Sequence, residues 1–230
     1  MRFVMGYLVA VCLLLIIISQ SIIFPTFYRP FFVWQYDRLN VAETIQVTDE
    51  TLMEVTDKLL DYMRSRRDSI EDIYAVVAGQ ERQFFSRIEI VHMVDVRDLY
   101  TLAFAIRNIA FFTSIALILT MALFRLEILS TIARCAREVV AGFLIILVLL
   151  TGVIALDFNR AFDIFHHIFF FNDYWILDPR VDLLINMVPL SFFIHISIFI
   201  LGLLLAASAL VIGVSTVILR RSPSPSITRL

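Results

Sequence analysis

Cysteine is scarce in this chain: only Cys12 and Cys135 occur, and both fall in or beside apolar segments. Cysteines this far apart offer no CxxC pair, no zinc-binding spacing and no disulfide framework. Charge is scarce as well, because charged residues make up 17% of the chain and the formal net charge is −2. A chain without a basic surface cannot neutralise phosphates, so nucleic acid is excluded as a partner.

Hydrophobic residues are abundant instead, at 60% of 230 residues, and the mean hydropathy is +0.87. These values are typical of an integral membrane protein rather than a soluble one. A helix needs about 20 predominantly apolar residues to cross the hydrocarbon core of a bilayer. The sequence predicts four such transmembrane helices, at residues 1–24, 108–124, 139–156 and 192–219.

Arginines in the short loops predict the orientation of these helices. They cluster at residues 125–138 and in the Pro- and Ser-rich tail, residues 220–230, which is expected to be disordered. Both segments are therefore predicted to be cytoplasmic, as are both termini. Residues 25–107 would then form an extracytoplasmic cap, and residues 157–191 an extracytoplasmic loop containing a short aromatic helix. The predicted fold class is an all-α membrane protein, with four transmembrane helices and a mainly helical cap.

Within the predicted cap, helical periodicity is clear in one stretch. Thr48 is a plausible N-cap, and apolar residues follow it at helical spacing: Leu52, Val55, Leu59, Leu60 and Met63. A second, shorter helix is expected after Ser69.

Two adjacent histidines, His166 and His167, stand in the aromatic stretch FDIFHHIFFFNDYW. On a helix, His166 shares one face with aromatic residues, namely Phe162, Phe165, Phe169 and Phe170, whereas His167 points towards Asp163. His167 is interpreted as a solvated or salt-bridged side chain. An ionisable His166 in apolar surroundings is a candidate functional group, although a satisfied interfacial histidine would look the same.

A third histidine, His92, lies between two acidic residues in the stretch EIVHMVDV. If the stretch is helical, Glu89 lies one turn before His92 and Asp95 one turn after it, where a carboxylate could orient the imidazole. If it is a strand, Asp95 faces the other way. Periodicity leaves both conformations open, and a local salt-bridge network remains the alternative to a catalytic role.

Other chemistries find little support in the residues. The sequence contains no HExxH motif, no Gly-rich phosphate loop and no GxSxG motif. The histidines lack a diagnostic zinc spacing, so neither a metal ion nor a cofactor is expected.

Three motifs in this order resemble one known family. They are E-x-x-H-M-x-D-V at Glu89–Val96, F-H-x-I-F-F at Phe165–Phe170 and N-D-x-W-x-L-D-P at Asn172–Pro179. With four predicted spans around them, they resemble the lipoprotein intramolecular transacylases of Gram-positive bacteria. The resemblance covers essentially the whole chain.

The resemblance implies a bacterial cell-membrane acyltransferase whose active site lies at the outer leaflet. The implied substrate is a diacylated lipoprotein reached through the membrane lipid, and the sn-2 acyl chain of its diacylglyceryl-cysteine moves to its own N-terminal amine, giving the lyso form. His92 and His166 are the catalytic residues that the motifs imply; His167 replaces His166 if the register differs.

On this hypothesis His92 is the general base, oriented by Asp95 or Glu89, and His166 is the acid or supports the oxyanion; the reverse assignment stays open. The expected substrate-binding residues are aromatic: Phe165, Phe169, Phe170, Tyr174 and Trp175. The rival interpretations are a metal-dependent membrane hydrolase and a non-catalytic assembly partner. The sequence leaves the oligomeric state undetermined.

Overall fold

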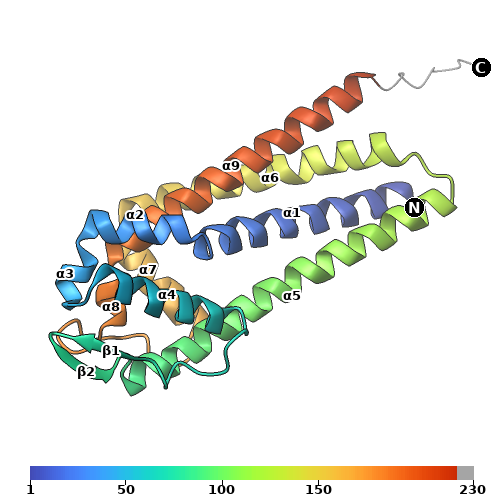
Figure 1. Ribbon diagram of the computed structural model, residues 1–230. Helices are drawn as coiled ribbons and strands as arrows, with labels where there is room; N and C mark the ends of the chain where they lie inside the picture. The colour runs from blue at the N-terminus through green and yellow to red at the C-terminus, as the bar shows by residue number, and fades with distance from the viewer. Residues whose placement is uncertain (222–230) are drawn as a thin grey trace, which may run out of the picture. The chain divides into compact units, whose positions relative to one another are not determined.

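The computed structural model describes residues 1–221, and helices account for most of them (Figure 1). In chain order the elements are α1 (Arg2–Thr26), α2 (Arg29–Leu39), α3 (Val41–Ile45), α4 (Asp49–Met63), β1 (Tyr74–Val77), β2 (Gln80–Gln83), α5 (Arg87–Leu123), α6 (Ile128–Leu156), α7 (Phe158–Phe169), α8 (Leu184–Met187) and α9 (Leu190–Arg221). Apart from Arg220 and Arg221, which end α9, the predicted disordered tail lies outside the described residues.

Four of the helices, α1, α5, α6 and α9, are long and apolar enough to cross a membrane. This agrees with the predicted number of spans. The predicted second span begins at residue 108, whereas α5 begins at Arg87 and runs on without a break. The part of α5 before Asn108 carries six charged side chains and is too polar to lie in a hydrocarbon core: Arg87, Glu89, Asp95, Arg97, Asp98 and Arg107.

The chain divides into two compact units. The first contains most of the apolar helices: Met1–Ser21, Ala105–Ala155 and the chain from Ile200 onwards. Here α1 approaches α6 closely at Gly6, where an added Cβ would lie only 2.8 Å from the Thr131 side chain and 2.9 Å from the Cys135 sulfur. Small residues permit such close helix packing inside a bilayer. Apolar side chains on α6, such as Ile145 and Leu149, are exposed, as lipid-facing positions must be.

An ion pair and a hydrogen bond join helices at one end of this first unit. Arg2 pairs with Glu127 at 3.0 Å, and the Tyr7 hydroxyl donates to Glu138 at 2.5 Å. The start of α1 and the α5–α6 connection therefore lie at the same end of the unit.

The second unit comprises Ile22–Phe104 and Leu156–Phe199. Its helix α4 has the predicted N-cap, because the Thr48 hydroxyl accepts from the Thr51 amide at 3.1 Å. All five apolar residues predicted for its inward face are buried: Leu52, Val55, Leu59, Leu60 and Met63.

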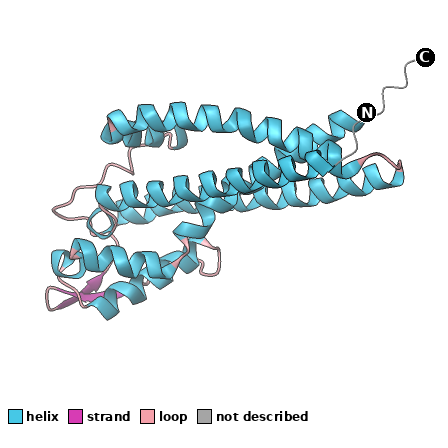
Figure 2. Ribbon diagram, turned by 90° about the horizontal axis from the view of Figure 1, so that it is seen from above, coloured by secondary structure: helices cyan, strands magenta, loops and turns pink. Residues whose placement is uncertain are grey.

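The prediction of a helix after Ser69 is wrong, because this segment forms an antiparallel hairpin of β1 and β2 (Figure 2). Ala78 and Gly79 turn the chain with φ values of 53° and 78°, as a two-residue hairpin turn requires. Tyr74 and the valines of β1 favour an extended backbone. The Ala-Gly pair after a β-branched run was the signal in the sequence for a turn.

Candidate active site

Two buried histidines meet in the second unit. His92 lies on the polar part of α5, His166 lies on α7, and their ring centroids are 6.2 Å apart. The two side chains are only 8% and 7% exposed. The stretch around His92 is helical, which decides the alternative that periodicity left open.

Asp157 caps the start of helix α7, because its carboxylate accepts from the Arg160 amide at 3.0 Å. Its inward face carries His166, whereas His167 on the next position is exposed. His167 bonds to the backbone carbonyl of Asp163 at 2.8 Å rather than to its carboxylate. The helical-face argument therefore separates the two histidines as expected.

A backbone carbonyl fixes the tautomer of His166. Its Nδ1 lies 2.7 Å from the carbonyl oxygen of Phe162, which can only accept, so Nδ1 carries the hydrogen. In the neutral ring, Nε2 is then the acceptor. Trp175 stacks on the same ring at 4.7 Å and holds its plane. His166 is thus prepared to take a proton at Nε2.

His92 differs from His166 in its surroundings. Its Nδ1 is buried and has no hydrogen-bond partner among residues 1–221. Burial lowers the pKa of His92 to about 4, with the nearby His166 acting in the same direction and Asp95 against it. Burial also lowers the pKa of His166, although the hydrogen bond to the Phe162 carbonyl opposes that shift. Both imidazoles are therefore neutral at pH 7.

Glu89 does not orient His92 through a hydrogen bond, contrary to the sequence-based expectation. Its carboxylate accepts from the backbone amide of Ser86, and the Ser86 hydroxyl accepts in turn from the Glu89 amide at 3.4 Å. This is a capping box at the start of α5. The other carboxylate oxygen accepts from the Leu184 amide at the start of α8. Glu89 is fully buried and both of its oxygens are occupied.

Asp95 also bonds elsewhere than to His92. Its carboxylate accepts from the Asn172 amide group at 2.9 Å, which joins α5 to the loop after α7. Asp95 still acts on His92 through its charge, since it raises the proton affinity of that ring. The two carboxylates thus accept hydrogen bonds from groups other than His92, and these three bonds fix the helix and the loop around the histidines.

Sequence reasoning missed three residues of this framework: Ser86, Asn172 and Asp182. The Ser86 hydroxyl donates to Asp182 at 2.8 Å, and the second Asp182 oxygen accepts from the Asp178 amide at 2.8 Å. The S-x-x-E spacing of Ser86 and Glu89 was a visible capping signal. The contacts of Asn172 with Asp95 and of Asp182 with Ser86 join residues 77 and 96 positions apart, and no local sequence pattern predicts them.

The predicted aromatic residues surround the histidines unequally. Phe170 contacts both rings, at 5.2 Å from His92 and 5.5 Å from His166. Phe165 lies against His166 at 5.4 Å, and Phe169 lies against Phe165 at 4.7 Å. Together with Trp175, they form an apolar wall around the pair. Tyr174 is exposed and lies in the loop without a ring contact among the described residues.

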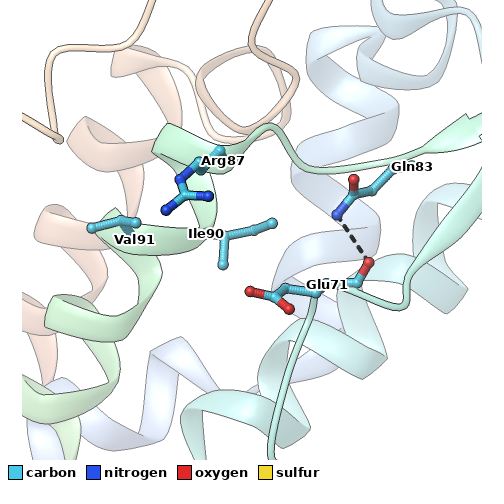
Figure 3. A pocket seen from close by; sticks show the side chains of 5 residues that line it. All are labelled: Glu71, Gln83, Arg87, Ile90 and Val91. Atoms are coloured by element: carbon cyan, nitrogen blue, oxygen red, sulfur yellow. Dashed lines mark hydrogen bonds between the residues drawn. The ribbon is translucent and has the colours of Figure 1, made fainter.

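Two cavities flank this part of α5. One, of about 310 Å³, adjoins the histidines through Phe170 and is lined by Asp95, Asp98, Leu99, Leu102, Phe169, Phe170, Phe171 and Asn172. The other, of about 450 Å³, is lined by Glu71, Gln83, Arg87, Ile90 and Val91. Figure 3 shows the Arg87 and Glu71 side chains of this second cavity with Ile90 between them.

Both imidazoles of the pair are groups that can take part in proton transfer. Within residues 1–221, no three His, Cys, Asp or Glu side chains gather closely enough to hold a metal ion. The fourth histidine, His195, bonds to the buried Gln35 at 2.9 Å and stands apart from the pair. What the site offers is a proton acceptor at His166 and a neutral imidazole at His92, in a largely apolar enclosure.

Comparisons with known proteins agree on one family. Residues 7–193 match the family model described as lipoprotein intramolecular transacylase Lit. A solved structure of the membrane-integral Lit from Bacillus cereus is similar over 96% of this chain and 97% of that one, with a TM-score of 0.76 and 21% identity. Two structures of variants of that protein, each with one histidine replaced, by arginine or alanine, have TM-scores of 0.71 and 0.72 at 20% identity. The similarity to these two structures extends over 93% and 94% of their chains and over 96% of this chain. No curated protein sequence gives a significant match.

Proposed function

Because the chain belongs to the lipoprotein intramolecular transacylase family, we propose that His92 and His166 catalyse acyl transfer within a lipidated cysteine. The chain is a multi-pass membrane protein, an acyltransferase of a family that acts on lipoproteins. The observation that carries the proposal is the pair of buried imidazoles with ring centroids 6.2 Å apart.

The proposed reaction moves the sn-2 acyl chain of a diacylglyceryl-cysteine to the free α-amine of the same cysteine. The ester becomes an amide, so the step runs downhill without a cofactor. The cyclic path passes through N, Cα, Cβ, S, two glyceryl carbons, the ester oxygen and the acyl carbon. Such medium rings close reluctantly, so the main task of the protein is to hold the two ends together.

His166 is the better candidate for the base. An α-ammonium is no nucleophile, and Nε2 of the neutral His166 can accept its proton. The ammonium loses two protons on becoming an amide, so this first proton is released to solvent. As the free amine attacks the acyl carbon, His166 takes the second proton from the nitrogen and gives it to the departing sn-2 oxygen, so that the C–N bond forms as the C–O bond breaks. The sequence suggested His92 as the base and His166 as the acid, with the reverse assignment left open. The proposed mechanism adopts that reverse assignment.

His92 then supports the oxyanion. A neutral imidazole N–H can donate to the developing negative charge on the acyl oxygen, provided that the ring does not take up a proton itself. The low pKa of His92 keeps the ring in that neutral form. The wall formed by Phe165, Phe169, Phe170 and Trp175 excludes water, which would otherwise hydrolyse the ester. Tyr174 lies next to Trp175 in the loop after α7, but its ring contacts none of the wall residues.

The proposed orientation follows from charge. The arginines near the α5–α6 connection and at the C-terminal end of the chain support a cytoplasmic location for that connection and for both termini by the positive-inside rule; they are Arg125, Arg134, Arg137, Arg220, Arg221 and Arg229. Residues 25–107 and 157–191 then lie on the outer side, and the histidine pair faces the outer leaflet, from which a lipidated substrate enters sideways.

The experiment that tests this function uses the purified full-length chain and a synthetic diacylated lipopeptide with a free amine. The expected product has an unreactive, acylated amine and an unchanged mass, as measured by tandem mass spectrometry. Loss of one acyl chain in mass would indicate a hydrolase instead, and sensitivity of that loss to chelators would indicate the metal-dependent rival. An unmodified peptide would favour the non-catalytic partner.

His167 provides a prediction on the register of the two histidines. His167→Ala is expected to retain most of the transfer activity, because the His167 side chain is exposed and its ring nitrogen contacts only a carbonyl of its own helix. The initial rate of amine acylation measures this. A loss as large as that caused by His166→Ala would mean that His167, not His166, carries the proton.

A further inference from the structure

The smaller cavity beside the histidines has no role in the chemistry described above. It shares Phe170 with the histidine pair, since this ring contacts both imidazoles and also lines the cavity. A molecule in the cavity would therefore lie next to the reacting centre.

The charged groups of this cavity are all acidic. Asp95 and Asp98 line it, and neither forms an ion pair among residues 1–221. The adjacent cation on α5, Arg97, is engaged elsewhere: its guanidinium lies over the Tyr62 ring at 4.9 Å and donates to the Asp68 carbonyl at 3.3 Å. The cavity thus presents uncompensated negative charge to whatever enters it.

Asp95 is also held in place. The Asn172 amide donates to one of its oxygens at 2.9 Å, and the backbone amide of Tyr174 donates to the Asn172 oxygen at 3.1 Å. The second Asp95 oxygen is left for another donor. His92 lies one turn earlier on the same helix. It is only 8% exposed, and its Nδ1 has no hydrogen-bond partner among residues 1–221. Asp95 therefore keeps an oxygen that can accept a hydrogen bond from a ligand in the cavity.

The rest of the lining is apolar. Leu99, Leu102, Phe169 and Phe171 contribute, and the Phe171 side chain is 96% exposed. A ligand that suits this lining is positively charged at one end and carries hydrocarbon beside the charge. A free lipid amine or the amine end of a lipidated cysteine has both properties.

We propose that this cavity binds the α-ammonium end of the diacylglyceryl-cysteine substrate, with Asp95 accepting a hydrogen bond from the ammonium and the apolar rim holding the first carbons of the lipid. This inference rests on the proposed function and deepens it by naming the group that recognises the amine. Asp95 is then a binding residue. The proton is passed on to His166, and Asp98 adds charge at the cavity mouth.

A non-reactive pair of ligands tests the proposal without relying on turnover. The pair consists of a diacylglyceryl-cysteine lipopeptide with an ether in place of the sn-2 ester, and its N-acetylated form. The wild-type chain is expected to bind the free-amine ligand more tightly than the N-acetylated one by about tenfold or more, the effect of one hydrogen bond between charged groups. Asp95→Asn is expected to remove this preference while leaving the affinity for the N-acetylated ligand unchanged.

Asp95→Asn is a suitable variant because asparagine keeps an oxygen that accepts from Asn172, so the loop stays attached. The matched control is Asp173→Asn. Asp173 is exposed and next to the cavity in sequence but does not line it, so this variant should keep the preference for the free amine. With the reactive ester substrate, Asp95→Asn should raise KM more than it lowers kcat.

Equal binding of the two ligands by the wild type would overturn the proposal, as would a preference that survives in Asp95→Asn. A uniform loss of affinity for both ligands would show a structural role for Asp95 instead and would also overturn it. Turnover of the ester lipopeptide by the wild type is measured separately, so failure of the ammonium site and failure of the proposed function remain distinguishable.

Discussion

Replacing either His92 or His166 with alanine is expected to lower the rate of acyl transfer by about two to four orders of magnitude, the contribution of a positioned acid–base group or an oxyanion donor. The reason is that each ring has a separate task. His166 offers its Nε2 to the proton, because Nδ1 is committed to the Phe162 carbonyl. His92 offers a neutral N–H that burial keeps from ionising. The measurement is the initial rate of amine acylation of a diacylated lipopeptide in detergent micelles.

The two variants also differ in a useful way. His166→Gln keeps a side chain that fills the site but has no basic nitrogen, so its activity should stay as low as that of His166→Ala. His92→Gln keeps an N–H donor, so part of the activity should return. His167→Ala is the matched control, since it makes the same chemical change one residue away. Full activity in His92→Ala or His166→Ala would remove that residue from the mechanism.

Replacing Glu89 with alanine is expected to lower the free energy of unfolding by about 2–4 kcal/mol, because hydrogen bonds to a buried charged acceptor are each worth about 1.5–3 kcal/mol. The change leaves the amides of Ser86 and Leu184 without their acceptor. Burial raises the pKa of Glu89, and hydrogen bonds from these amides oppose that shift. Thermal unfolding of the purified variant in detergent micelles measures the loss.

Glu71→Ala is the control for that experiment, since it removes an exposed carboxylate whose loss should change stability by less than about 0.5 kcal/mol. Activity of Glu89→Ala should fall along with the folded fraction, because Glu89 fixes the start of α5 one turn before His92. If Glu89→Ala unfolded at the wild-type temperature and yet lost activity, Glu89 would act on the chemistry directly and not through the capping box.

Much of the secondary structure around the site could be predicted from local pattern. The Thr48 cap and the apolar spacing of α4 are local signals. The structure confirms both the cap and the buried face that they predict. The same holds for the inward face of α7 that carries His166. The hairpin of β1 and β2 was missed because a four-residue strand has too few positions for its period to be distinguished from the first turn of a helix.

The roles of the carboxylates could not be predicted in the same way. Spacing places Glu89 and Asp95 one turn on either side of His92, which is true of the helix, but it does not say which partner each one bonds. Glu89 bonds to an amide 95 residues further along the chain, and Asp95 bonds to a side chain 77 residues further along. Only tertiary packing decides which of the possible donors lies near each carboxylate.

The sequence by itself determined that this is a membrane protein with four apolar helices, that α4 is capped at Thr48, and that His166 rather than His167 faces inward. Each of these depends on composition or on the period of one helix, which local residues carry. Only the tertiary structure decided that α5 and α7 bring two imidazoles together, that a carbonyl sets the tautomer of His166, and that Asp95 opens onto a cavity. These depend on contacts between segments far apart in the chain, whose register is set by how side chains of different elements fill the same space.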